Sequence, residues 1–496
     1  MKGINRIFIC ISLLFLGCQS STKTQEASFK QLSNQIDLYA NNCLKKGNIN
    51  SLAIAIYKDG QVYQNYYGSA YKDSRKLPND KTVYEIASIT KVFVGSLAAK
   101  AVLENKIAID DDIRNYLKGD YSNLEYEGTP ITIKNLLTHT LGFKNRKPQK
   151  LEEIENKIAS GYYENRSIAY NMKDFLEELK TIELDKKPGS FYQYNSIGPE
   201  LVAYILEQVY RDSFKNILSR FLDELDMKDT YLENSQEQQS KNLMDGFDET
   251  GILAPKSKSP LLGGGGGMLS TLPDLVKFMK FQLESNNPLI KESTKTLFEN
   301  NDDDKLGYLW EVGNAEEEGF YYLKSGTSYG IQSIILICPD TNYGLILLAN
   351  NTSEKAFYDW VNLYNQIEPD LIKYPKINLV SLLKEELLTN TDKAIKRYKD
   401  SMQEGNKYYC NSNNLNSIGY ELLNDNKTKE SIQVFKLFVS EFPKNANAYD
   451  SLGEAYFVNS DYTNALINFK KSLELNPNNE NAKNYISKIE TLIQKG

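Results

Sequence analysis

The sequence predicts an α+β domain built on one antiparallel sheet, followed by a separate all-α module. Strand-like segments occur near the start of the chain and again after residue 319, with helical segments between them, and a C-terminal stretch repeats every 34 residues. At 496 residues the chain is too long for one ordinary domain. Its net charge of −7 argues against nucleic acid as a partner, because phosphate binding depends on basic patches.

The first residues have the pattern of an export signal. Two basic residues precede an apolar run at 7–16, which is shorter than the ~20 residues that a membrane-spanning helix needs. The run ends at Gly17-Cys18, which resembles a lipoprotein cleavage box; a plain signal peptide is the alternative. We expect a signal peptide at 1–17, a lipid on Cys18, a polar tether at 18–28, and a bacterial envelope protein facing the periplasm or exterior. Membrane attachment is expected through the lipid only.

Five segments are expected to form the sheet. Residues 52–57 and 61–67 flank Lys58-Asp59-Gly60, a pattern typical of a β-hairpin. Three late segments are rich in Ile, Leu and Tyr: 320–324, 331–338 and 344–350. The two ends of the domain, assigned to 29–372, should therefore close one sheet.

The middle of the domain has helical periodicity. Residues 86–103 carry a tightly packable apolar surface, directly after a candidate strand at 83–85. Further helix signals occur at 133–137, 173–179, 199–209, 214–222 and 273–283. We therefore expect an all-α region inserted between the early and late strands.

The C-terminal segment contains two copies of one pattern. The first copy has Leu415, Ile418, Gly419, Leu422, Ser431, Phe435 and Pro443, and the second has Tyr449, Leu452, Gly453, Tyr456, Ala465, Phe469 and Pro477. The spacing of 34 residues is the period of a tetratricopeptide helix-turn-helix repeat, in which the glycine lets two helices approach closely. We assign 409–496 to such repeats and 373–408 to a helical connector. Two repeats bury too little core alone, so helices at 379–388 and 392–402 should pack beneath them. The module is expected either to bind a protein partner or to brace the first domain.

No cofactor or metal is expected. The chain has a single histidine, His139, whereas metal sites gather several His, Cys or carboxylate ligands. Cys43, Cys338 and Cys410 lie far apart and are expected to be small buried side chains, with their disulfide status open. The glycine run at 263–267 lacks the Lys-Ser/Thr of a phosphate loop, so it is expected to border a substrate site.

The candidate nucleophile is Ser88, in Ser88-Ile89-Thr90-Lys91. Two residues three apart on a helix share one face, so the Lys91 amine can reach the hydroxyl. A serine needs an adjacent base, and burial near a second cation would make this amine lose its proton more readily. Other Ser-x-x-Lys tetrads occur, but this one alone opens a long apolar helix after a candidate strand.

Five ordered motifs carry a family resemblance. They are Ser88-Ile-Thr-Lys91, Leu136-Leu-Thr-His-Thr-Leu-Gly142, Pro188-Gly-Ser-Phe-Tyr-Gln-Tyr-Asn-Ser196, Gly266-Gly-Met-Leu-Ser-Thr271 and Lys324-Ser-Gly-Thr327. This set resembles the serine β-lactamase-related family, which includes class C β-lactamases, low-molecular-weight penicillin-binding proteins and allied esterases. The resemblance covers roughly residues 30–360 and implies a β-lactamase/transpeptidase-like fold. It also places His139 in a structural turn.

The resemblance assigns a role to each site residue. Ser88 would be the nucleophile, Lys91 the proton acceptor or relay, and Tyr194 a second base that protonates the leaving group. Lys324 would bind a substrate carboxylate and lower the pKa of Tyr194. The backbone N–H groups of Ser88 and Thr327 would form the oxyanion hole.

Two motifs depart from the family pattern. Where the family has Tyr-x-Asn, this chain has Tyr194-Asn195-Ser196, so a shorter hydroxyl replaces the amide that faces substrate. Tyr192 is a rival for the tyrosine position. In the lysine motif Ser325 replaces threonine and keeps the hydroxyl, and lysine itself favours a carboxylate-bearing substrate.

The resemblance implies a serine hydrolase that acts through an acyl-enzyme on peptidoglycan D-alanyl peptides, β-lactams or related amides and esters, of carboxypeptidase or esterase type. The alternative is a non-catalytic envelope protein that uses the pocket and the repeats to recruit ligands or partners. The motif set alone leaves the substrate open.

Overall fold

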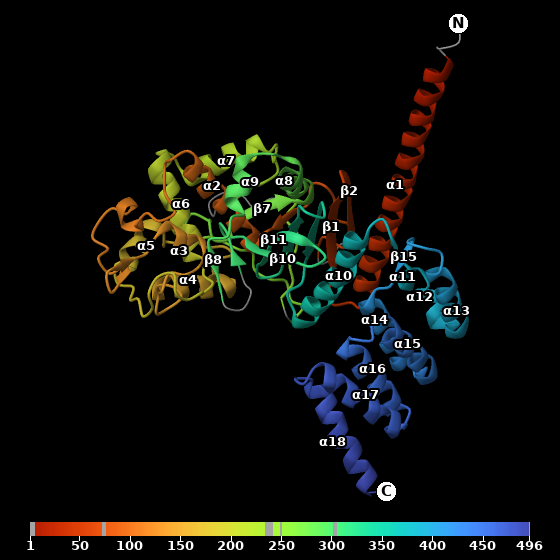
Figure 1. Ribbon diagram of the computed structural model, residues 1–496. Coiled ribbons are helices and arrows are strands. Elements are labelled where there is room, and N and C mark those ends of the chain that lie inside the picture. Colours follow the sequence, from red (N-terminus) through yellow and green to blue (C-terminus); the bar gives the residue numbers. More distant parts are fainter. Residues whose placement is uncertain (1–4, 72–75, 234–241, 249, 301–304, 496) are drawn as a thin grey trace. The chain divides into compact units, whose positions relative to one another are not determined.

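The computed structural model describes residues 5–71, 76–233, 242–248, 250–300 and 305–495, with side chains from 25 to 493 within these ranges. The chain divides into two compact units, one of residues 40–364 and one of residues 1–39 together with 365–496. Helices α1 (Asn5–Lys45) and α10 (Glu354–Lys373) each contribute to both units. Both helices are labelled in Figure 1.

The first unit is built on an antiparallel sheet, in which the described residues form eight strands. The order is β2 (Gln61–Gly68), β1 (Ser51–Lys58), β13 (Tyr343–Ala349), β12 (Gln332–Cys338), β11 (Gly319–Thr327), β10 (Glu311–Ala315), β9 (Lys305–Leu306) and β8 (Phe298–Glu299). The early hairpin pairs directly with the late strands, which confirms the expected closure of the sheet. Strands β8 to β10 extend the sheet beyond the five expected segments.

The centre of the sheet is covered on both faces. Every residue of β1, β12 and β13 is buried, which explains why these segments read as continuous apolar runs rather than alternating ones. A stack of aromatic rings joins helices to the sheet: Phe93 and Phe278 have ring centroids 4.2 Å apart, and Trp310 lies 5.0 Å from Tyr322 of β11. This packing fixes the helix that follows the candidate nucleophile against the strand that carries Lys324.

Helices fill the sequence between the early and late strands, as expected. They are α2 (Thr90–Leu103), α3 (Ile133–Leu137), α4 (Gln149–Ala159), α5 (Met172–Leu179), α6 (Ile197–Tyr210), α7 (Phe214–Glu224), α8 (Leu272–Glu284) and α9 (Pro288–Ser293). Helices α4 and α9 were not expected. A second sheet has the order β3 (Val83–Glu85), β7 (Met268–Thr271), β6 (Tyr231–Leu232), and a small hairpin pairs β4 (Glu125–Tyr126) with β5 (Thr129–Pro130).

The second unit is helical at its C-terminal end, in agreement with an all-α module. Its helices are α11 (Leu379–Leu382), α12 (Lys384–Thr389), α13 (Thr391–Met402), α14 (Ser412–Asn424), α15 (Thr428–Glu441), α16 (Ala446–Val458), α17 (Tyr462–Leu475) and α18 (Glu480–Lys495). The pairs α14–α15 and α16–α17 begin 34 residues apart. A Cβ on Gly453 would lie 2.9 Å from the ring of Phe469, and one on Gly419 would lie closer still to Phe435, so both glycines permit close helix packing. Side chains of α11 to α13 share one apolar cluster with α14 and α15.

A buried carboxylate joins several parts of this unit. Asp370 accepts hydrogen bonds from Tyr39 at 3.1 Å, from Asn378 at 3.2 Å, and from Tyr409 of the short strand β15 (Tyr408–Tyr409). Strand β15 pairs in parallel with β14 (Ile377–Asn378). Burial raises the pKa of Asp370 to about 6, although these three hydrogen bonds act in the opposite direction.

The expected leader and Cys18 lie outside the residues whose side chains are described. The backbone of this segment, from residue 5 on, continues without a break through the proposed tether as helix α1. Within the described part of the chain, no helix combines the length and the apolar character that a membrane crossing requires.

Candidate active site

Ser88 lies at the junction of a short strand and a long helix. Strand β3 ends at Glu85, and a turn of 3-10 helix, Ala87–Ile89, leads into α2. The residue before the serine, Ala87, has φ of +46°, a backbone conformation that costs a non-glycine residue of the order of 1 kcal/mol. This strained turn fixes the position of the Ser88 hydroxyl at the start of the helix.

Lys91 and Tyr194 both reach that hydroxyl. The Nζ of Lys91, on the first turn of α2, donates to the Oγ of Ser88 at 3.0 Å. The phenol of Tyr194, in the loop before α6, donates to the same oxygen at 2.7 Å, although 106 residues separate the two. The structure thus brings the three expected catalytic side chains together, and it is Tyr194 rather than Tyr192 whose hydroxyl meets Ser88.

The turn around His139 supports the tyrosine loop. The backbone carbonyl of His139 accepts a hydrogen bond from the N–H of Gln193 at 2.9 Å. The centroid of the His139 ring lies 4.6 Å from the centroid of the Tyr194 ring. Burial, together with the charges of Lys324 and Lys91, holds the pKa of His139 well below its usual value. The neutral, buried imidazole therefore packs against Tyr194 and supports the position of its ring.

The electrostatics of the site lower the pKa of both candidate bases. Burial lowers the pKa of Lys91, and the nearby charge of Lys324 lowers it further, while the partner Tyr194 acts in the opposite direction. Burial raises the pKa of Tyr194, but the charges of Lys91 and Lys324 and the hydrogen bond with Ser88 outweigh it, so the net shift is downward. The Lys91–Tyr194 pair can therefore lose a proton at lower pH than either group would in water.

Lys324 lies on β11 and is buried, with its Nζ 4.9 Å from the centroid of the Tyr194 ring. The same Nζ forms an ion pair of 2.8 Å with Glu311 of β10, a partner that the sequence did not indicate. Ser325 and Thr327 are exposed on the same strand. A Cβ on Gly326 would lie 2.8 Å from the backbone N of Ser88, so only glycine lets β11 approach the nucleophile this closely.

A glycine loop and a buried glutamate complete the surroundings of Lys91. The carbonyl of Gly265 accepts a hydrogen bond from the Nζ of Lys91. The loop is held by Glu200 of α6, whose carboxylate accepts from the N–H of Gly265 at 2.9 Å and from that of Leu262 at 3.0 Å. Burial raises the pKa of Glu200, against the effect of these backbone donors. Sequence reasoning placed the glycine run beside the site and missed Glu200, which is not part of any motif.

The two residues of the exchanged pair, Asn195 and Ser196, have different surroundings and different hydrogen-bond partners. The side chain of Asn195 is buried and accepts a hydrogen bond at 3.0 Å from the N–H of Gly198, in the first turn of α6. Ser196 is exposed, and its Oγ lies 3.4 Å from the Nζ of Lys91. A hydroxyl, rather than an amide, therefore stands beside the lysine.

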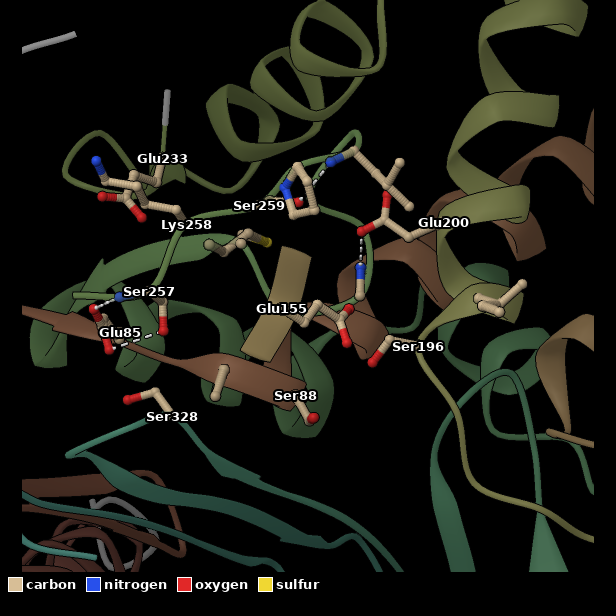
Figure 2. A pocket seen from close by; sticks show the side chains of 18 of the residues that line it. Glu85, Ser88, Glu155, Ser196, Glu200, Glu233, Ser257, Lys258, Ser259 and Ser328 are labelled. Atoms are coloured by element: carbon tan, nitrogen blue, oxygen red, sulfur yellow. Dashed lines mark hydrogen bonds between the residues drawn. The ribbon is translucent and has the colours of Figure 1, made fainter. Parts of the chain in front are cut away.

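A cavity of about 560 Å³ opens at Ser88. Tyr194, Ser196 and Thr327 are among the residues that line it. Figure 2 shows Ser196 near Ser88. At the far side Figure 2 shows Glu85 and Glu233 with Ser257 and Lys258, and the carboxylate of Glu85 accepts from the N–H of Ser257 at 2.7 Å. Burial, then repulsion from Glu85, raises the pKa of Glu233 to about 7. Within the described residues, no group of three or more His, Cys, Asp or Glu side chains is placed to hold a metal ion.

The family model described as Beta-lactamase matches residues 36–365, about two thirds of the chain. The chain belongs to the beta-lactamase family. Protein flp of Staphylococcus aureus (strain N315) is 29% identical over 331 residues, which are 64% of this chain and 63% of the relative, so the chain spans less than two thirds of that protein's length. A beta-lactamase of Providencia stuartii is 21% identical over 400 residues, 71% of this chain and 94% of that protein.

Solved structures show the same beta-lactamase fold. A beta-lactamase/D-alanine carboxypeptidase from Yersinia pestis aligns with a TM-score of 0.59 and 20% identity, covering 69% of this chain and 98% of that one. A penicillin-binding protein homologue from Pyrococcus abyssi aligns with a TM-score of 0.57 and 21% identity, covering 72% and 81%. The fold class expected from the sequence is thereby confirmed.

Proposed function

We propose that this chain is a serine hydrolase of the penicillin-recognising type, in which Ser88 forms an acyl-enzyme. One observation carries the proposal: the Oγ of Ser88 lies 3.0 Å from an amine and 2.7 Å from a phenol, both with lowered pKa values. A nucleophile with an adjacent base, at the mouth of a cavity, is the arrangement that acyl transfer requires.

The reaction would proceed in two halves. Ser88 Oγ bonds to the substrate carbonyl carbon while its proton passes to the Lys91–Tyr194 pair. The tetrahedral oxyanion would be held by the backbone N–H groups of Ser88 and Thr327, each worth about 3–4 kcal/mol of transition-state stabilisation. Tyr194 then protonates the departing amine or alkoxide. Water, deprotonated by the same pair, cleaves the acyl-enzyme and restores Ser88.

The substrates proposed are amides and esters: D-alanyl peptides from peptidoglycan, β-lactams or related compounds. The names of two similar proteins, a beta-lactamase/D-alanine carboxypeptidase and a penicillin-binding protein homologue, support this class. The cavity is large enough to hold a small peptide or drug-sized acyl group.

The test combines a chromogenic ester with a fluorescent penicillin and the full-length protein. Ser88→Ala should abolish ester turnover and covalent labelling, with an unchanged thermal unfolding transition. Mass spectrometry of a trapped acyl-enzyme should place the adduct on the peptide that contains Ser88. If wild-type protein shows neither turnover nor labelling, the chain is better described as a non-catalytic envelope protein that binds ligands or partners.

We also propose an envelope location and a partner for the helical module. Support comes from the sequence: the leader that ends at Cys18 and the 34-residue pattern in 409–496. Labelling with a fatty-acid analogue should be lost on Cys18→Ser. Pull-downs with and without 409–496 would separate partner binding from a bracing role.

A further inference from the structure

The ammonium group of Lys324 already has an anionic partner within the protein. Its Nζ lies 2.8 Å from Oε1 of Glu311, and the lysine side chain is 3% exposed while that of the glutamate is 41% exposed. Glu311 begins β10, the strand that pairs with β11. A buried cation that is paired with a carboxylate has much of its charge compensated, so it attracts a second anion weakly.

Among the described residues, neither member of this ion pair belongs to the lining of the cavity at Ser88. One side of the Lys324 ammonium faces the Tyr194 ring at 4.9 Å. The described lining of this cavity includes Thr327, the last residue of β11, and Ser328, which follows it. Where β11 ends, the cavity wall therefore presents Thr327 and Ser328 to the substrate, not the ammonium group of Lys324. An incoming carboxylate that approached Lys324 would meet the carboxylate of Glu311.

We propose that Glu311 determines substrate specificity: by pairing with Lys324 it disfavours substrates that carry a carboxylate at this position and favours neutral esters and amides. This inference rests on the proposed function and narrows its substrate class. A neutral and an anionic substrate should differ in how they interact with the ion pair. A neutral substrate leaves the Lys324–Glu311 pair intact, whereas an anionic one either displaces Glu311 or binds beside it against like-charge repulsion.

Glu311 does not touch Ser88 in the structure, so its effect on the chemistry would be indirect. The charge of Lys324 contributes to lowering the pKa of Tyr194, and the carboxylate of Glu311 partly offsets that charge. Removal of the carboxylate should move the ascending limb of the pH–rate profile for a neutral substrate to lower pH. A residue that only stabilised the fold would not produce this shift.

The experiment uses two aryl esters that differ in one group on the leaving phenol, a carboxylate in one and a carboxamide in the other. Wild-type full-length protein should hydrolyse the carboxamide ester with the higher kcat/KM. Glu311→Gln should reduce this preference by about tenfold, mainly through a lower KM for the carboxylate ester. Glu311→Asp keeps the charge and should retain the wild-type order. Glu299→Gln, which removes an exposed carboxylate paired with Lys305 on the same sheet, is the matched control and should change neither value.

The outcomes separate the two proposals. If wild-type protein hydrolyses both esters and Glu311→Gln leaves the ratio unchanged, Glu311 does not set specificity, while the hydrolase proposal stands. A wild-type preference for the carboxylate ester would also overturn the inference. Absence of Ser88-dependent turnover of either ester would overturn the proposed function and the inference with it. Should Glu311→Gln fail to fold, the wild-type protein still tests the inference, because a kcat/KM for the carboxylate ester that equals or exceeds that for the carboxamide ester would overturn it.

Discussion

The carboxylate of Glu200 accepts a 2.9 Å hydrogen bond from the backbone N–H of Gly265, whose carbonyl in turn accepts from Lys91. This contact connects helix α6 to the glycine loop and, through the loop, to the proton-transfer pair. The position of the Lys91 amine therefore depends on a buried side chain that belongs to no recognisable motif.

Glu200→Gln should reduce both stability and acylation. The amide would point an N–H toward backbone N–H groups that now donate to a carboxylate, at a cost of about 1–3 kcal/mol in the free energy of unfolding. Displacement of Gly265 should misplace Lys91 and lower kcat about 10- to 100-fold. The control is Glu207→Gln on the same helix, where the carboxylate accepts from the N–H of Phe214 at 2.8 Å, remote from Ser88. Equal losses of kcat in the two variants would contradict a specific role for Glu200.

Gly326→Ala tests the close approach of β11 to the nucleophile. The new Cβ would lie 2.7 Å from the carbonyl O of Ile86 and 2.8 Å from the N of Ser88, so the strand must move away. We expect a loss of about 1–3 kcal/mol in stability and, if one oxyanion donor is displaced, about 10²- to 10³-fold in kcat.

The control for this substitution is Gly266→Ala. A Cβ there would make ordinary contacts at 3.7 Å with Ala87, and this glycine does not have a positive φ. It should leave stability near the wild-type value. Retention of full activity in Gly326→Ala would exclude the proposed oxyanion hole at Ser88 and Thr327.

The pH dependence of hydrolysis should follow the charge of Lys324. This charge lowers the pKa of both Lys91 and Tyr194. The double variant Lys324→Gln/Glu311→Gln removes the ion pair without leaving one charge buried alone. The pKa values of both remaining groups should then rise, so the ascending limb of kcat/KM against pH for a neutral ester should move to higher pH and activity at pH 7 should fall. An unchanged limb would mean that the pair does not perform the rate-limiting proton transfer.

The sequence predicted the parts of the site that lie in recognisable motifs. The spacing of Ser88 and Lys91 indicated that the amine can reach the hydroxyl, and the family resemblance of the ordered motifs assigned the tyrosine role to Tyr194. The partner of Lys324 could not be predicted in this way, because the Lys324–Glu311 pair depends on which strand lies next to β11. Strand β10 itself was not expected.

The same reason explains what was missed in the fold. Strands β8 and β9 contain two residues each, too few for an alternating pattern to be visible. The contact of Glu200 with the glycine loop joins residues 65 apart in sequence and leaves no local signal. Sequence periodicity therefore predicted the long elements, and the family resemblance indicated the site residues, while the side chains that hold them in place required the tertiary structure.

The helical module offers a test that is independent of catalysis. Gly419→Ala and Gly453→Ala each add a methyl group toward a phenylalanine ring of the paired helix, Phe435 and Phe469. The approach is closer at Gly419, so Gly419→Ala should be the more destabilising, within a range of about 1–3 kcal/mol. Thermal unfolding followed by circular dichroism would give the order. The reverse order, or no effect at either site, would contradict the close helix packing.

Asp370→Asn should change how stability depends on pH. The pKa of Asp370 is raised by burial from 3.8 to about 6 in the folded protein, so the folded state binds its proton more tightly than the unfolded state does. The resulting stabilisation is fully present below about pH 4 and is lost as the pH rises through 6. Asparagine resembles the protonated side chain and does not titrate. The variant should therefore gain stability relative to wild type between pH 4 and pH 7, by up to about 3 kcal/mol.

Denaturant unfolding of both proteins at several pH values measures this difference directly. Asp392→Asn is a suitable control, because it removes an exposed carboxylate from helix α13 of the same unit. The difference between each variant and the wild type is the informative quantity, since all other carboxylates cancel in it. A difference for Asp370→Asn that stays constant from pH 4 to pH 7 would show that this carboxyl does not titrate in that window. The hydrogen bonds from Tyr39, Asn378 and Tyr409 would then have to hold it ionised throughout, despite its burial.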